Sequence, residues 1–209
     1  NLRLLRHESQ SRENVVKELE ALCDEAKMPW HVRANALRFL GTFRVYHSFS
    51  LSDEQDRRLK LLCVRSLRDE RPEVHDAAMT SLTGFLSSMD DDYVQKHVKK
   101  FIKDSSKRIP KKDVPEKRRM ALNRRHGGLI GLTAVVRAFP YSMRSFLPDA
   151  LVCLSNHLND PAPLNKTAQK TLTEFKRTHQ DTWSQIRDHF TEEHWEIMED
   201  ALVSPHYFA

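Results

Sequence analysis

The chain contains 209 residues, of which 39% are hydrophobic and 30% charged, and its formal net charge is +5 at pH 7. Only 5 residues are glycine, and a composition rich in Leu, Ala, Lys, Arg and Glu favours helices over sheets. No apolar run reaches the length that crosses a bilayer, so we expect no contact with the membrane interior. Because the sequence starts at Asn1 rather than Met, we expect it to be a piece of a longer protein.

The excess positive charge is confined to one segment. From Lys99 to Arg125 the sequence holds twelve Lys or Arg and three acidic residues, whereas the rest holds 22 basic and 26 acidic residues. This distribution argues against a uniformly basic nucleic-acid-binding protein. It predicts a nearly neutral scaffold that carries one basic segment.

Amphipathic helices are predicted along almost the whole chain. In chain order they are expected at 11–26, 32–43, 53–68, 74–85, 92–104, 124–135, 145–158 and 164–175, followed by helices near 182–189 and 192–203. Capping boxes are predicted at Ser52 with Gln55 and at Thr182 with Gln185. No stretch has the alternating pattern of a strand.

Four of these segments repeat one pattern without gaps. They are 32–43, 74–85, 124–135 and 164–175, and their starts differ by 42, 50 and 40 residues. Each has a small residue followed four positions later by leucine: Ala36 and Leu40, Ala78 and Leu82, Gly128 and Leu132, Ala168 and Leu172. This spacing places an apolar stripe on one helix face, and the period is typical of HEAT-type helix pairs.

The predicted fold is therefore an all-α solenoid of about four HEAT-like hairpins over residues 1–203, with an extended tail at 204–209. The 50-residue offset indicates an insertion, and it falls at 105–119, which contains two prolines and much of the excess charge. We expect this insertion to be a surface loop.

Two aromatic-rich connections are expected to cover the ends of the hydrophobic core, although a ligand groove lined by the same side chains is the alternative. The residues concerned are Phe43, Tyr46, Phe49, Phe139, Tyr141 and Phe146. Cys23, Cys63 and Cys153 each follow apolar residues, and their odd number predicts reduced core thiols.

No catalytic or metal-binding motif is present, so an enzyme is not expected. The sequence lacks a nucleophile elbow, a P-loop and an HExxH pair. The glycines of RHGGLIGL (125–132) are interpreted as sites of close helix contact rather than as a phosphate loop. His75 and His179 stand beside acidic residues, which is interpreted as an ordinary exposed helix face.

The residues from 124 onward resemble a known family. The segments RRHGGLIGL, HLNDPAP and TLTEFKRTHQDTW, followed by the terminal LVSPHYFA, are similar to the C-terminal end of the large single-chain HEAT-repeat activator of the proteasome. The resemblance implies docking on the α-subunits of the proteolytic core and opening of its gate. It places Tyr207 at the hydrophobic position of the docking tail, Phe208 at the tyrosine position and Ala209 at the terminal carboxylate.

The same resemblance implies a second role, bromodomain-like recognition of acetylated histones. The family attributes the acetyl-lysine pocket to an Asn-Phe pair after the second of these repeats, where this chain has Ser87 and Ser88. Asn123 and Asn156 are the remaining amide candidates. Acetyl-lysine reading is thus the alternative function, and a HEAT scaffold for an unrelated partner is a third.

The basic segment has three competing interpretations: a solvated loop, a nuclear-import signal and a polyanion site. Its clusters are Lys107, Arg108, Lys111, Lys112, Lys117, Arg118 and Arg119. No aromatic residues alternate with these charges, so sequence-specific nucleic-acid binding is not expected. The resemblance implies an inositol polyphosphate as the polyanion, to which Lys166 and Lys170 could contribute, and a location in the nucleus and cytoplasm.

Overall fold

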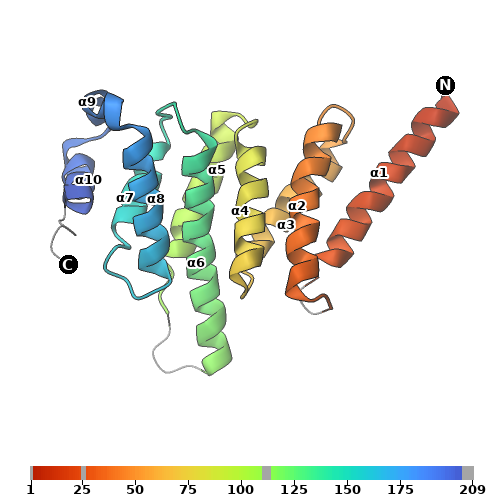
Figure 1. The fold of residues 1–209 in the computed structure, drawn as a ribbon, viewed down its shortest axis with the longest axis horizontal. Coiled ribbons are helices and arrows are strands. Elements are labelled where there is room, and N and C mark those ends of the chain that lie inside the picture. Colours follow the sequence, from red (N-terminus) through yellow and green to blue (C-terminus); the bar gives the residue numbers. More distant parts are fainter. Residues whose placement is uncertain (1, 25–26, 110–113, 204–209) are drawn as a thin grey trace. The chain divides into compact units, whose positions relative to one another are not determined.

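The computed structural model describes residues 2–24, 27–109 and 114–203, and all regular structure within these ranges is helical (Figure 1). This confirms the prediction of an all-α, solenoid-like fold. The chain divides into two compact units, residues 1–85 and 86–209. None of the helices in the described ranges has the length and apolar character needed to span a membrane.

The first unit consists of four helices. They are α1 (Leu2–Leu22), α2 (Trp30–His47), α3 (Asp53–Ser66) and α4 (Pro72–Leu86), the last of which ends one residue beyond the unit. α1 packs against both α2 and α3. The stripe predicted for 32–43 lies on α2, where Ala36, Leu40 and Phe43 are buried.

A buried ion pair fixes the turn between α3 and α4 to α2. Nε and Nη2 of Arg33 donate to the two carboxylate oxygens of Asp69, each at 2.8 Å. The backbone carbonyl of Asp69 also contacts His75 Nε2. His75 is therefore a buried side chain, as is His179 of the second unit, and the assignment of both to an exposed face was wrong. Removal of either Arg33 or Asp69 would lower the free energy of unfolding, because the remaining charge would be buried without a partner.

The second unit contains the remaining helices. They are α5 (Asp91–Ser105), α6 (Pro115–Ala138), α7 (Leu147–Ser155), α8 (Leu164–Thr178), the short α9 (Trp183–Ile186) and α10 (Glu192–Val203). α6 packs against α5, α7 and α8, and α10 packs against α7 and α8. The predicted stripes are buried here too, including Leu132 and Val135 on α6 and Ala168 and Leu172 on α8.

The glycines of α6 allow α5 to approach closely, as the sequence predicts. A Cβ atom placed on Gly128 would lie 2.6 Å from the backbone nitrogen of Ser105 and 2.7 Å from the carbonyl oxygen of Phe101. A Cβ on Gly131 would lie 2.6 Å from the ring of Phe101. Side chains at these two positions would push α5 and α6 apart.

Several boundaries differ from the sequence prediction, among them that of α1, which spans Leu2–Leu22 rather than 11–26. The capping box predicted at Ser52 and Gln55 is present, whereas the side chain of Thr182 makes no capping hydrogen bond. The segment 180–189, predicted as one helix from 182, consists of a 3₁₀ turn, the short α9 and a second 3₁₀ turn. α7 is shorter than the predicted 145–158. The loop predicted over 105–119 ends earlier, because α6 begins at Pro115, where the missing N–H of proline costs a helix nothing.

The aromatic connections divide into buried and exposed side chains. Phe43, Phe139 and Phe146 are buried, as predicted for residues that cover the core. Tyr46, Phe49 and Tyr141 are instead exposed, and the prediction was wrong for them. Cys63 and Cys153 are buried free thiols and Cys23 is half-buried, which agrees with the predicted reduced cysteines.

Candidate functional site

The predicted docking residues follow the last helix of the second unit. α10 ends at Val203, and it is anchored by Trp195 and Met198, whose side chains are buried. Met198 Sδ also accepts a hydrogen bond from Ser155 Oγ on α7 at 3.3 Å. Tyr207, Phe208 and Ala209 lie outside the described residues. The segment that carries them thus begins next to a helix fixed to the core of its unit.

The basic residues of the predicted insertion do not form one loop. Lys107 and Arg108 are exposed and follow α5, whereas Lys117, Arg118 and Arg119 are exposed on the first turns of α6. Lys111 and Lys112 lie outside the described residues. A helix spreads three successive side chains around its axis. The second cluster therefore does not present its charges as an extended chain would.

The C-terminal end of this basic segment is held by acidic partners. Arg124 Nε donates to Asp104 Oδ1 at 2.7 Å, which ties α6 to the end of α5. Arg125 Nη2 donates to Asp160 Oδ2 at 2.7 Å, and His157 Nδ1 contacts the same oxygen at 2.6 Å. These two arginines have structural roles, whereas Lys107, Arg108, Lys117 and Arg118 are exposed.

The residues considered for acetyl-lysine binding are not brought together as a pocket. Ser87 and Ser88 are exposed in the turn that follows α4. Asn156 is exposed at the C-terminal end of α7, and Asn123 is half-buried on α6. Among the pockets that we describe, none is lined by any of these four residues.

Two further lysines line a hollow on α8. Lys166, Lys170 and Arg177 stand on one face of the helix, around a depression of about 530 Å³ that also includes Glu174. The spacing of four and seven residues keeps the three cations on one side. Its lining therefore carries three cations and one carboxylate.

The first unit carries a groove, but it is not the one that the sequence offered as the alternative for the six aromatic side chains. It encloses about 640 Å³ and is lined by residues of α2 and α4. One of the lining residues, Ser81 on α4, donates a hydrogen bond from Oγ to the backbone carbonyl oxygen of Leu37 on α2 at 2.8 Å. Tyr46 is the one residue of the six predicted aromatics that lines it. Exposed Phe39, Val45 and Phe49 add to the apolar character of the same helix and the turn after it.

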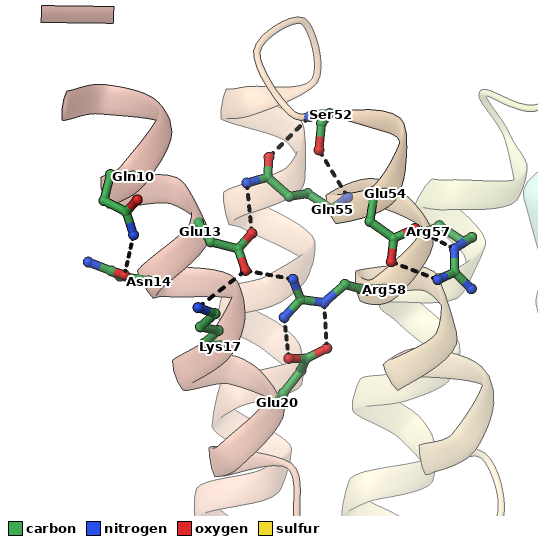
Figure 2. Close-up of polar contacts among 10 residues, drawn as sticks. All are labelled: Gln10, Glu13, Asn14, Lys17, Glu20, Ser52, Glu54, Gln55, Arg57 and Arg58. Carbon is green, nitrogen blue, oxygen red and sulfur yellow. Dashed lines mark hydrogen bonds and ion pairs between the residues drawn. The ribbon is translucent and has the colours of Figure 1, made fainter. Parts of the chain in front are cut away.

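Charged groups are concentrated between α1 and α3 of the first unit (Figure 2). Arg58 reaches from α3 to both Glu13 and Glu20 of α1, and its Nη1 lies 2.7 Å from Glu13 Oε1. Gln55, the N3 residue of the capping box, also donates to Glu13 at 3.2 Å. The hydrogen bonds from Arg58 hold the pKa of Glu13 and that of Glu20 below the ordinary carboxyl value.

The thiols are poor nucleophiles. Burial raises the pKa of Cys23 to about 11, and burial likewise raises the pKa of Cys63 and that of Cys153. The reactive species is the thiolate, so these cysteines are largely protonated at neutral pH. No group of three or more His, Cys, Asp or Glu in the described ranges is arranged to hold a metal ion.

Paired helices with shared apolar stripes define a helical-repeat protein. Comparison with known proteins makes this class more specific. Residues 122–209 match the family model described as proteasome activator complex subunit 4-like, C-terminal. The chain therefore belongs to the proteasome activator subunit 4 family and corresponds to its C-terminal region.

Individual relatives agree with this assignment. Over 86% of its length, the chain is 37% identical to proteasome activator complex subunit 4B of Danio rerio and 35% identical to proteasome activator complex subunit 4 of Homo sapiens. Over 39% of its length it is 33% identical to proteasome activator BLM10 of Saccharomyces cerevisiae. The chain spans 10% of the length of the first two relatives.

Proposed function

We propose that this chain is the C-terminal part of a non-enzymatic proteasome activator, which docks on the α-ring of the proteolytic core through its carboxyl tail and promotes opening of the gate. The observation that carries the proposal is the match of residues 122–209 to the C-terminal family model, together with relatives that are named proteasome activators. The anchoring of α10 supports it, because a tail that leaves a fixed helix loses less freedom on docking.

The chemistry of the last residues suits a pocket on another protein. A terminal carboxylate binds to a lysine and to backbone N–H donors, and neighbouring aromatic rings add apolar burial. Tyr207, Phe208 and Ala209 supply these groups. Pro205 restricts the backbone before them and reduces the entropy lost on binding.

The experiment moves the carboxylate without removing an aromatic ring. One added residue after Ala209 should prevent the chain from stimulating peptide hydrolysis by purified proteasome core, while its helical content stays unchanged. Replacement of Phe208→Tyr is the matched variant, and it should match or exceed the parent because it restores a hydroxyl donor worth about 0.5–1.5 kcal/mol. Equal stimulation by the extended and parent chains would refute docking through the tail.

We further propose that the basic residues around the start of α6 act in nuclear import, which would place the protein in the nucleus as well as the cytoplasm. Lys107, Arg108, Lys117, Arg118 and Arg119 are all exposed, which supports access by an import receptor. Replacement of Lys117, Arg118 and Arg119 with serine should abolish the nuclear accumulation of a tagged chain. Undiminished accumulation would rule the signal out.

A polyanion site on α8 is supported by the hollow that Lys166, Lys170 and Arg177 line. An inositol polyphosphate presents several phosphates that these cations could pair with. Calorimetric titration of inositol hexakisphosphate should show binding that weakens with added salt and is lost in Lys166→Ser/Lys170→Ser. Identical titrations of parent and variant would exclude this site.

Recognition of acetylated histones is the alternative function, and exposure of Ser87 and Ser88 makes this turn accessible to a peptide. An acetylated histone peptide should bind more tightly than the unmodified peptide, and Ser87→Ala/Ser88→Ala should remove the difference. Equal binding of both peptides by the parent chain would argue against the reader function.

A further inference from the structure

We propose that the exposed face of α5 binds the phosphate backbone of a nucleic-acid duplex without reading its sequence. Four exposed lysines make up this face, and we call them the lysine row: Lys96, Lys99, Lys100 and Lys103. The inference concerns the second unit alone, and it depends neither on docking to the proteasome nor on nuclear import.

The lysine row lies on one side of a helix whose other side is packed. Spacings of three, four and seven residues place the four side chains within about 100° of the helix circumference and within about 10 Å along its axis. Val94, Val98 and Phe101 are the buried apolar residues of α5, which packs against α6 and α7. The packing therefore holds the backbone of the row in a fixed line.

The fold does not account for the charge of the row. Two acidic residues of α5 pair with arginines instead, Asp104 with Arg124 at 2.7 Å and Asp91 with Arg144 at 3.6 Å. The third, Asp92, precedes the row at the start of the helix. Within the described ranges no ion pair involves a lysine of the row. Only the last of the four stands in the final turn, where a cation complements the helix dipole.

The composition of this face indicates the class of partner. Interfaces between proteins are depleted in lysine and centre on buried aromatic or other large side chains. Among the described residues, none of the exposed large apolar side chains lies on α5. A helix that binds a membrane surface buries its apolar side in the lipid, whereas the apolar side of α5 is buried within the protein. Interfaces with nucleic acids are strongly positive, and most of their hydrogen bonds go to phosphate and sugar.

The aromatic residues of α5 favour a duplex over a single strand. Proteins that bind single strands use aromatic rings on which successive bases stack. On α5 the rings of Tyr93 and His97 pack against each other with centroids 4.4 Å apart, and both side chains are half-buried. Phe101 is buried. The exposed face thus offers charges without a stacking surface, and lysine pairs with phosphate as a point charge that carries no sequence information.

The test is the fluorescence anisotropy of a short labelled DNA duplex, titrated with the 209-residue chain at salt concentrations from about 50 to about 200 mM. Each phosphate contact contributes about −0.9 to the slope of log K against log salt. Lys96→Gln/Lys100→Gln/Lys103→Gln should therefore reduce the magnitude of the slope by about 2–3. Two duplexes of unrelated sequence should bind equally. An RNA duplex of the same length is a second arm, and the tighter of the two identifies the source of the phosphates.

Lys166→Gln/Lys170→Gln/Arg177→Gln is the matched control, because it removes the same number of cations from exposed positions on α8 of the same unit. This control should keep the slope of the parent chain. Lys96→Arg/Lys100→Arg/Lys103→Arg retains the charge of the row and should keep the slope as well. Equal losses in the two glutamine variants would show that net charge alone attracts the duplex, which would overturn the proposal.

The parent chain alone also tests the class of partner. Binding to neither duplex at the lowest salt concentration would overturn the proposal. Tighter binding to a single strand of the same length, or binding to phosphatidylserine vesicles without binding to a duplex, would overturn it too.

Discussion

Gly128 illustrates how one missing side chain sets a contact between two helices. The atoms that a Cβ at this position would meet belong to the backbone of Ser105 and Phe101, which cannot rotate away as a side chain could. Helix propensity alone would favour alanine at any glycine in a helix interior. The close approach of α5 therefore outweighs propensity at this position.

Gly128→Ala should consequently lower the free energy of unfolding by about 1–3 kcal/mol, the usual cost of overpacking. Gly84→Ala on α4 is the matched control, since a Cβ there would meet no atom within 4 Å. This control should raise stability by about 0.5–1 kcal/mol through helix propensity. Chemical denaturation would measure both, and equal changes would contradict the steric account.

Two phenylalanines of the same connection make a second comparison. Phe43 is 7% exposed in the core of the first unit, whereas Phe49 is 104% exposed. Phe43→Ala should cost about 3–5 kcal/mol, because it removes a buried ring and leaves a cavity. Phe49→Ala should change stability by less than about 0.5 kcal/mol. Thermal unfolding of both variants measures this, and a large loss for Phe49→Ala would show that its ring is buried.

At the element scale, the network of Arg58 with Glu13 and Glu20 joins α1 to α3 (Figure 2). The two carboxylates are partly exposed, at 27% and 36%, so solvent screening reduces the energy of these pairs. The pKa values of both carboxylates are lowered in the folded protein. Their contribution to stability is therefore present above the ordinary carboxyl pKa and lost as pH falls through the folded values.

Arg58→Met should destabilise the protein by about 1 kcal/mol at pH 7, and the difference from the parent should shrink below about pH 4.5. Arg57→Met is the control: Arg57 pairs with Glu54 on an exposed surface and links no two helices. Urea denaturation at several pH values would separate the two. A difference for Arg58→Met that stayed constant from pH 7 to pH 3 would contradict the role of the carboxylates.

The helices and their buried faces were largely predictable from the sequence. The stripe through Ala78 and Leu82 repeats in every pair, and any helix with such a stripe must bury it. The start of α6 was not predictable, because Pro115 is typical of loops as well as of first helical positions. The exposure of Phe49 and the burial of His179 depend on how the helices pack, so neither has a signal in local sequence.

Over the whole molecule, the proposed docking residues follow a helical-repeat fold in the sequence. The fold and the family are established by the helices and by the comparisons with relatives. The chain spans 10% of the length of the first relatives, so the docking proposed above would use a small part of a long protein. A short tail that inserts into a pocket can provide binding from such a small part, because a few well-placed groups supply most of the binding free energy.

The most direct test is the affinity of this chain for purified proteasome core, measured by biolayer interferometry with and without residues 207–209. We expect the parent chain to bind and the truncated chain to lose binding, while circular dichroism shows the same helical content for both. Binding of equal affinity by the two chains would contradict the account.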